Sequence, residues 1–446
     1  MFDEDTIVAI ATANGIGSIS IVRVSGKEAL PIALKISKKE NLTPRVATLH
    51  SLYNSNNELI DEALLIYFKN PNSFTGEDIV EFQCHGGMAI SNIILDEVVK
   101  HGGRLAQPGE FSKRAFHNGK IDLSKAEAIA KIIEARSEDA VKLLARQLKG
   151  ELSTFVEDIR KDLLFMLAYT EVNIDYAEED LPEDIFKQIE VKLDNIKIKL
   201  HTTLDASKRR EGLIEGFKVA IIGKPNVGKS SLLNKLLNFD RAIISDIAGT
   251  TRDTIEESVK IGTHLIKIVD TAGIREANDV IEKIGIEKSL EAVSQADIII
   301  ALFDNSKALD SEDEKILDIL DEINNKEKLL VLNKSDLQNL FDKSKLSEFI
   351  ELSTKVDINP LIKHIEKILD ANSHGDDMTL ISKRQVQAVE QTLYHIKHSH
   401  EPLHSGELEF FAYHITEAMQ HISNITRPYE NDQMLDVMFG EFCLGK

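Results

Sequence analysis

The residues from Gly223 to Ser230 have the composition and the spacing of a phosphate-binding loop. They read GKPNVGKS, which matches the pattern GxxxxGKS/T, and they stand between an apolar run typical of a buried strand and an expected helix. Glycines allow backbone N–H groups to turn inward around phosphate oxygens, Lys229 can bridge the β- and γ-phosphates, and Ser230 can ligate Mg²⁺. A chance glycine turn can produce the same pattern, so other motifs must decide between the two interpretations.

Three further segments stand in the order that a guanine-nucleotide site requires. Asp270 to Gly273 closes an expected strand, where an aspartate can hold Mg²⁺ through water and a glycine N–H can contact the γ-phosphate. Asn333 to Asp336 closes another, and the Asp336 carboxylate can accept two hydrogen bonds from guanine N1 and N2, a pair of donors that adenine lacks. Ser353 to Lys355 follows the last expected strand, where a loop can contact guanine O6. Because a chance match of all four segments in this order is negligible, they predict a site for GTP.

The elements that must hold these segments alternate between strands and helices. The runs FKVAIIG, SVKIG, HLIKIVD, DIIIALFD, KLLVLNK and FIELS have strand length, and helical stretches separate most of them. This alternation predicts a doubly wound α/β domain over residues 216–372, with the phosphate-binding loop after its first strand.

The segments on either side of this domain have a different character. Residues 1–118 read as mixed α/β, with β-favouring residues on both sides of an Asn-Gly turn. Over 119–215 and 373–446 apolar residues recur at helical spacing, which predicts the core of a helical bundle. One such stripe is formed by Ile189, Leu193, Ile196 and Leu200. Ser124 and Glu127 have the spacing of a capping box at the start of the first helical part. The sequence therefore predicts an α/β plus α architecture, with a P-loop α/β domain inserted into a helical domain.

Length, charge and cysteine content limit the classes of protein to which the chain can belong. A chain of 446 residues is expected to form two or three domains. No run of 18 apolar residues occurs and the N-terminus begins with acids, which predicts no membrane span, secretory signal or transit peptide. Two cysteines, Cys84 and Cys443, exclude a disulfide framework and favour a reducing, cytoplasmic location. A net charge of −21 argues against a broad RNA-binding surface, so contact with RNA would be local or supplied by a partner.

Four sequence segments extend these predictions, because together they resemble one family over the whole chain. They are DIAGTTRD at 246–253 in the switch I position, PNSFTGEDIVEFQCHGG at 71–87, PGEFSKRAFHNGKIDLSKAEAI at 108–129 and FCLGK at 442–446. With these segments the chain resembles the MnmE (TrmE) family of tRNA-modification GTPases. The resemblance implies three parts: an N-terminal α/β domain for folate binding and dimerisation, a helical domain, and an inserted G domain. In this chain they correspond to 1–118, to 119–215 with 373–446, and to 216–372.

The resemblance also implies an activity. Members of the family hydrolyse GTP to GDP and phosphate. With a FAD-containing partner of the MnmG (GidA) family, they place a carboxymethylaminomethyl or aminomethyl group on C5 of the tRNA wobble uridine, and the carbon comes from 5,10-methylenetetrahydrofolate. The implied assembly is a homodimer that joins this partner in a heterotetramer. Two other interpretations are a ribosome-assembly GTPase, against which the acidic charge and the folate-type N-terminus weigh, and a regulatory switch without modification chemistry.

The resemblance assigns the hydrolytic role to a glutamate. Ile274 stands where Ras-like sites have a glutamine that orients the attacking water, and its side chain cannot take that role. The family places a glutamate in switch II, and the matching residue is Glu282, which we expect to be catalytic. Without the resemblance, Glu282 would be interpreted as a solvated residue on a helix face.

Metal ligands follow from the same resemblance. Thr251 would complete the Mg²⁺ shell with Ser230, and K⁺ would take the place of an arginine finger. The expected K⁺ ligands are Asn226 and the backbone oxygens of Ser245, Ile247 and Thr250. The full set of expected nucleotide-binding residues is Asn226, Val227, Gly228, Lys229, Ser230, Ser231, Ser245, Asp246, Ile247, Ala248, Gly249, Thr250, Thr251, Asp270, Thr271, Ala272, Gly273, Asn333, Lys334, Asp336, Ser353, Thr354 and Lys355.

The folate contacts of the family fall on four charged residues of this chain. They are Arg23, Glu81, Lys120 and Lys446. A glutamate can accept two hydrogen bonds from a pteridine ring, and basic residues suit the anionic glutamyl tail. Each of the four alone would be interpreted as an ordinary surface charge. Cys443 also matches a family cysteine, and its thiol can be either redox-active or merely buried.

Asp336→Asn is expected to shift the preference of the site from GTP towards XTP, because an amide presents a donor where xanthine presents an acceptor. Competition binding with the two nucleotides measures this shift, and Asp342→Asn, outside the four segments, is the matched control. Undiminished GTP affinity in Asp336→Asn would contradict the assignment of this carboxylate to the base.

Overall fold

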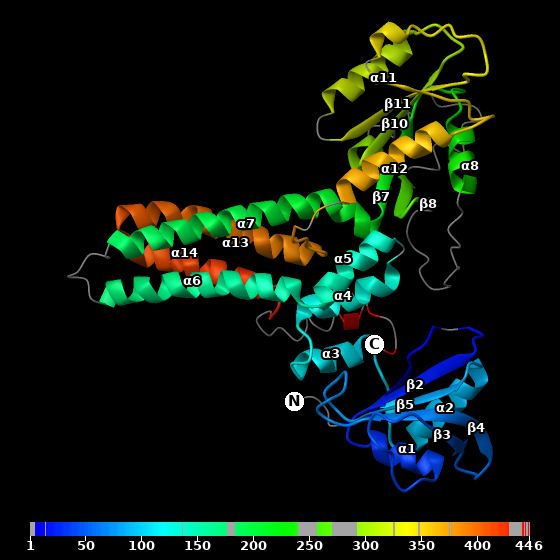
Figure 1. Ribbon diagram of the computed structural model, residues 1–446, viewed down its shortest axis with the longest axis vertical. Helices are drawn as coiled ribbons and strands as arrows, with labels where there is room; N and C mark the ends of the chain where they lie inside the picture. Colours follow the sequence, from blue (N-terminus) through cyan, green and yellow to red (C-terminus); the bar gives the residue numbers. More distant parts are fainter. Residues whose placement is uncertain are drawn as a thin grey trace. The chain divides into compact units, whose positions relative to one another are not determined.

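The computed structural model describes residues 5–13, 15–135, 137–175, 183–239, 257–269, 292–323, 326–346, 348–373, 375, 377–427, 439–440, 442 and 445. Figure 1 shows the chain coloured along its sequence. Contacts divide the chain into two units. The first comprises Met1–Ala130, Gly150–Asp180 and Glu401–Lys446, and the second comprises Lys131–Lys149 and Leu181–His400.

A six-stranded sheet forms the N-terminal part of the first unit. Its strands are β1 (Ile7–Ile10), β2 (Ile19–Ser25), β3 (Thr48–Tyr53), β4 (Leu59–Phe68), β5 (Ile79–His85) and β6 (Arg104–Leu105). They lie in the order β3-β4-β5-β2-β1-β6, and every neighbouring pair is antiparallel except β1 and β6. The β-favouring residues on both sides of the Asn-Gly turn form β1 and β2, which pair with each other.

Helices cover this sheet because its strands bury alternate side chains. The helices of the first unit are α1 (Ala29–Ser37), α2 (Met88–Lys100), α3 (Glu110–His117), most of α4 (Leu123–Glu134), α6 (Glu151–Asp175) and α14 (Leu408–Ser423). Val22 and Val24 of β2 share one core with side chains of α1 and α2. Phe111 of α3 packs instead with Ile7 and Ala9 of β1, in a separate small core. In the helical part of the unit, α6 packs along α14.

The cap of α4 differs from the predicted one. Asp122 Oδ1 accepts hydrogen bonds from Ser124 Oγ (2.6 Å) and from the Lys125 N–H (2.9 Å), and Ser124 lies inside the helix. The predicted capping box of Ser124 and Glu127 is therefore wrong. An aspartate immediately before the first helical residue is a better acceptor for the unpaired N–H groups of the first turn than a serine within it.

The second unit contains a six-stranded sheet with the predicted doubly wound arrangement. Its strands are β7 (Phe217–Ile222), β8 (Glu257–Ile261), β9 (His264–Val269), β10 (Ile298–Asp304), β11 (Glu327–Asn333) and β12 (Ile350–Glu351). They lie in the order β12-β11-β10-β7-β9-β8, and all neighbours are parallel except β8 and β9. The predicted α/β architecture is confirmed.

Both faces of this sheet are covered, as its continuous apolar runs require. The helices of the second unit are α5 (Glu138–Leu148), α7 (Glu183–Glu215), α8 (Lys229–Phe239), α11 (Ser311–Glu322), α12 (Asn359–Ser373) and most of α13 (Lys383–Ser405). On β10, Ile300 and Leu302 lie in the core that includes side chains of α8 and α12. Ala301 and Phe303 lie in the opposite core, which includes side chains of α11.

The helical stripes predicted from the sequence are confirmed. Ile189, Leu193, Ile196 and Leu200 lie on α7 and are all buried. Within the described part of the chain, no helix combines the length and the apolar character that crossing a membrane would need.

Candidate functional site

Three of the predicted motif segments meet at one edge of the second sheet. β7, β11 and β12 belong to its parallel part, so their carboxyl ends lie at the same edge. The phosphate-binding loop follows β7, the segment 333–336 follows β11, and the segment 353–355 follows β12. Loops at this edge of a doubly wound sheet are placed to bind one ligand together.

The phosphate-binding loop has a backbone that requires its glycines. Gly228 has φ 109°, and a Cβ there would lie 2.3 Å from Nδ2 of Asn333. Gly223 has φ 152°, and a Cβ there would lie 2.4 Å from the backbone oxygen of Leu302. Asn226 adopts φ 63° in the left-handed region, which asparagine tolerates better than most residues. The loop therefore approaches its neighbours more closely than side chains at the two glycines would allow.

Lys229 is held at the mouth of this loop. Its Nζ donates hydrogen bonds to the backbone oxygens of Gly223 (2.6 Å) and Lys224 (2.8 Å), and burial lowers the pKa of its ammonium group. Lys229 is also the first residue of α8, where free N–H groups and the helix dipole favour an anion. A bound phosphate would reverse the effect of burial, because its negative charge favours the protonated lysine. Ser230 and Ser231 follow in the first turn of this helix.

The neighbouring Lys224 fastens the loop to α11. Its Nζ donates to Oδ2 of Asp310 (2.6 Å) and to Oδ2 of Asp313 (2.7 Å). Asp310 is the N-cap of α11, and with Asp313 it forms a capping box. The two carboxylates thus stabilise the start of α11 and also bind Lys224. This lysine therefore has a structural role, because it connects the loop to the helix.

The Asn333 side chain joins three segments of the predicted nucleotide site. It is 1% exposed. Its Nδ2 donates to the backbone oxygen of Val227 in the phosphate-binding loop (2.7 Å), and its Oδ1 accepts from the N–H of Thr354 (2.9 Å). A single amide thereby sets the spacing between the phosphate side and the base side of the site.

Lys334 adds a second link to the phosphate-binding loop. Its Nζ donates to the backbone oxygen of Asn226 (2.9 Å) and to Oδ2 of the buried Asp304 (2.6 Å). Burial would raise the pKa of the Asp304 carboxyl, but hydrogen bonds from Lys334 and Ser306 lower it below its ordinary value. Asp304 was not predicted as a site residue. The available signal was its position as the last residue of β10, at the same edge as the motifs.

The last motif segment holds the Asp336 side chain. Its Oδ1 accepts a hydrogen bond from Ser353 Oγ (2.6 Å), and this bond lowers the pKa of the carboxyl. Ser353 Oγ also accepts from the Lys355 N–H (3.3 Å). An ionised carboxylate has lone pairs to spare after one such bond, so it can still accept hydrogen bonds from a base.

Other predicted site residues lie outside the described part of the chain. They are Ser245 to Thr251, Asp270 to Gly273, the candidate catalytic residue Glu282, Cys443 and Lys446. Their roles stay predictions.

In the first unit, Arg23 and Glu81 face each other on neighbouring strands. They are register partners on β2 and β5, and Arg23 Nε donates to Glu81 Oε1 (2.9 Å). The Arg23 guanidinium lies 6.0 Å from the ring centre of Phe74 and 5.8 Å from that of Phe111. Lys120 lies close to the loop that carries Phe74, since a Cβ on Gly76 would come within 2.9 Å of Lys120 Cε. Phe74 and Phe111 were not predicted, because two phenylalanines carry no chemical signal in a sequence.

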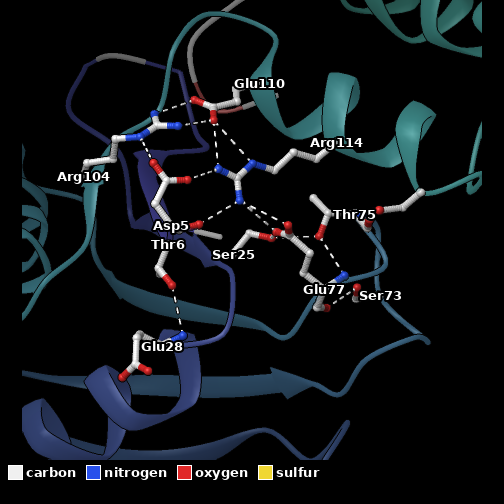
Figure 2. A network of polar contacts seen from close by, with 11 residues as sticks. Asp5, Thr6, Ser25, Glu28, Ser73, Thr75, Glu77, Arg104, Glu110 and Arg114 are labelled. Atoms are coloured by element: carbon white, nitrogen blue, oxygen red, sulfur yellow. Dashed lines mark hydrogen bonds and ion pairs between the residues drawn. The ribbon is translucent and has the colours of Figure 1, made fainter. Parts of the chain in front are cut away.

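Figure 2 shows a polar network of the first unit that is centred on Arg114. The Arg114 side chain is 4% exposed, and it contacts three carboxylates. Its NH2 lies 2.7 Å from Asp5 Oδ1 and 3.0 Å from Glu110 Oε1, and its NH1 lies 3.1 Å from Glu77 Oε1. Three segments that are far apart in the sequence are therefore held by one guanidinium.

The network extends to β2 and to β6. Ser25, two residues after Arg23 on β2, donates from Oγ to Glu77 Oε2 (2.7 Å), and its hydroxyl also bonds that of Thr75. Arg104 on β6 donates through two nitrogens to the carboxylate of Glu110 (2.6 and 2.8 Å). Burial would raise the pKa of the Glu110 carboxyl, but hydrogen bonds from Arg104, the Gln107 N–H and Arg114 lower it.

Comparison with known proteins identifies relatives over the full chain. The family model for the MnmE helical domain matches residues 123–443, and the model for the GTP-binding protein TrmE N-terminus matches residues 6–120. The tRNA modification GTPase MnmE of Aliarcobacter butzleri is 76% identical over 446 residues, which is 100% of both chains. That of Sulfurimonas denitrificans is 61% identical over 444 residues, covering 99% of this chain and 100% of the relative.

Among solved structures, Aquifex aeolicus Era Y63A bound to GDP.AlF4- is 27% identical over 40% of this chain and 66% of that chain, with a TM-score of 0.26. A TM-score this low does not establish a shared architecture.

Arg114→Met is expected to lower the free energy of unfolding by about 3–5 kcal/mol. Three carboxylates would lose their shared cation and would remain close together without a compensating charge. Thermal unfolding of the full chain measures the loss. Arg45→Met is the matched control, because the Arg45 guanidinium donates to the backbone oxygen of Asn72 in an exposed contact. Equal unfolding temperatures for the two variants would contradict a structural role of the network.

The effect of Arg114→Met is also expected to depend on pH. The pKa values of Asp5 and Glu110 are lowered in the folded chain, so the stability that these carboxylates contribute is present at neutral pH and is lost as the pH falls through the lowered values. The difference in unfolding temperature between wild type and variant should therefore narrow as the pH falls below about 4. A difference that stays constant into acid would contradict this.

Proposed function

The chain belongs to the MnmE family of tRNA modification GTPases, and we propose that it hydrolyses GTP within the modification of tRNA wobble uridine. The GTPase activity belongs to the family, and the described part of the site supports its phosphate-binding and base-binding sides. The observation that carries the proposal is the Asn333 amide, which fixes the phosphate-binding loop and the base-binding loop at a set distance. A site for guanine and phosphates of one nucleotide needs that spacing before the ligand arrives.

On the phosphate side, Lys229 and the start of α8 bind the anion. The Gly223 and Lys224 backbone oxygens hold the Lys229 ammonium at the loop, where we propose that it contacts the β- and γ-phosphates. Ser230 directly follows Lys229 in α8, and we propose its hydroxyl and that of Thr251 as the protein ligands of Mg²⁺. Mg²⁺ would neutralise charge on the β- and γ-oxygens. Glu282 is proposed to orient the attacking water.

On the base side, Asp336 discriminates guanine from adenine. Its carboxylate is held by Ser353 and is ionised at neutral pH, so it can accept from guanine N1 and N2. Ser353 to Lys355 would lie against O6. With ATP, the same acceptor would meet no donor pair, and the unpaired charge would cost affinity.

We further propose that the first unit binds a tetrahydrofolate that donates the carbon for the modification. Arg23, Glu81 and Lys120, with Lys446, are the proposed contacts. The support is that Arg23 and Glu81 are paired on neighbouring strands beside two aromatic rings. Glu81 contacts Arg23 through Oε1, and we propose its Oε2 as the acceptor for a ligand donor. The domain division 1–118, 119–215, 216–372 and 373–446, the homodimer, the FAD-containing partner of the MnmG family and the cytoplasmic location belong to the same proposal.

Wobble-uridine analysis of tRNA tests the proposal as a whole. A strain that lacks this chain is expected to lose the aminomethyl-type group on C5, and the wild-type chain should restore it. Lys229→Met should fail to restore the group, because phosphate binding is lost, whereas the control Lys218→Met, at a position outside the motifs, should restore it. Unchanged wobble uridine in the deletion strain would refute the proposal, and a ribosome-assembly defect in that strain would favour the alternative of an assembly GTPase.

K⁺ is proposed to take the place of an arginine finger, with Asn226 and the backbone oxygens of Ser245, Ile247 and Thr250 as ligands. Asn226 is exposed at the loop, and its backbone oxygen is already used by Lys334, so the side-chain amide is the group available to an ion. Hydrolysis should be stimulated by K⁺ much more than by Na⁺, and Asn226→Ala should abolish the stimulation while GTP binding stays nearly intact. Equal rates in the two salts, or a K⁺ response that survives Asn226→Ala, would contradict this role.

A further inference from the structure

The β8–β9 hairpin forms the last two strands on one side of the second sheet and joins the predicted segments 245–251 and 270–273. β8 begins at Glu257, shortly after the segment 245–251, and β9 ends at Val269, immediately before Asp270. β9 is parallel to β7, whose carboxyl end leads into the phosphate-binding loop, so Val269 lies at the nucleotide edge. His264 and the hairpin turn therefore lie at the opposite end of the sheet, away from the nucleotide.

At that far end a directional hydrogen bond connects the hairpin to α5. Thr263 Oγ1 donates to Oδ2 of Asp139 (2.9 Å), which stands in the first turn of α5. The other oxygen of Asp139 pairs with Lys142 (3.0 Å). The N-cap of the same helix, Ser137, donates from Oγ to the backbone oxygen of Leu213 in α7 (3.2 Å). The turn of the hairpin is thus connected to two helices outside the sheet.

A second set of contacts holds the hairpin turn against α12 and β7. His264 is buried, its Nε2 lies 2.9 Å from Asp370 Oδ1, and its ring meets that of Phe217 edge-on at 6.1 Å. Gly262 has φ 59°, and a Cβ there would lie 2.6 Å from Glu366 Oε1. The turn is therefore closely packed. A shift of the hairpin along its axis must displace the side chains of α12 and β7 that contact it.

We propose that the β8–β9 hairpin transmits the state of the nucleotide site to α5 and α7, and that Thr263 and Asp139 are the positioning residues of this link. The inference rests on the proposed GTP site, because the two segments that the hairpin joins are those expected to contact the γ-phosphate and Mg²⁺. A paired strand is stiff along its length, so displacement at the nucleotide edge reaches the turn. Displacement of the turn changes the length and angle of the Thr263–Asp139 hydrogen bond. Because hydrogen bonds weaken steeply with poor geometry, this change alters the stability of the first turn of α5.

Hydrogen exchange of the full chain, with and without GDP plus aluminium fluoride, tests the link. In the wild type, amides of α5 should exchange more slowly in the nucleotide complex. Thr263→Val removes the donor and keeps the shape of the side chain, so the nucleotide-dependent slowing in α5 should fall by about fivefold, the effect of one lost hydrogen bond. Asp139→Asn should give a similar loss, and the double variant should lose no more than either single one, because both changes break the same contact.

Two controls separate this link from a merely structural role. Thr392→Val removes a buried hydroxyl whose bond, to the backbone oxygen of Ala388, stays within α13, so it should leave the α5 response unchanged. GTP hydrolysis by Thr263→Val should stay near the wild-type rate while its support of tRNA modification falls. The inference would be overturned if the exchange rates of the α5 amides in the wild type did not change on nucleotide binding. It would also be overturned if the nucleotide-dependent slowing in Thr263→Val were as large as in the wild type. Failure of nucleotide to protect the phosphate-binding loop itself would instead refute the proposed GTP site.

Discussion

The geometry of the second unit depends on the side-chain amide of Asn333. A carboxamide carries a donor and an acceptor at one end, so a single residue can satisfy a carbonyl of one loop and an N–H of another. Here the two partners are the Val227 oxygen and the Thr354 N–H, which belong to the phosphate side and the base side of the site. The amide lies so close to the first loop that Gly228 has no room for a Cβ. Glycine is therefore required at position 228 by the Asn333 side chain as well as by the approach of the loop backbone to phosphate.

In the first unit, a guanidinium likewise connects several segments through its hydrogen bonds. Arg114 has donors pointing in several directions from one plane, and it contacts Asp5, Glu77 and Glu110 at once. The contact with Glu77 links this network to Ser25 at the end of β2, close to Arg23. In both units, one buried polar group makes several hydrogen bonds at once and so holds together segments that are separate in the sequence.

The chain is acidic overall, but two lysine side chains are held at the phosphate-binding loop. Their local positive charge is compatible with a site for an anion there. A net charge of −21 repels nucleotides and RNA at a distance. Lys229 is directed by two backbone oxygens and Lys334 by the buried Asp304, so the positive charge is fixed at the loop. Lys224 shows the opposite use, since two aspartates engage it for the scaffold. The partners of each lysine thus fix where its positive charge lies.

The sequence by itself determined whatever depends on neighbours along the chain. The strand runs, the helical stripes and the motif segments at the ends of β7, β11 and β12 could all be predicted, because strand and helix periodicity and loop chemistry act over a few residues. The capping box at Ser124 failed even at short range, since Asp122 competes for the same N–H groups. Only the tertiary structure decided the partners of Asn333, Asp304 and Arg114. Arg114 and Asp5 are 109 residues apart and Arg114 and Glu77 are 37 apart, so their contact is set by sheet order and register, which no local pattern encodes.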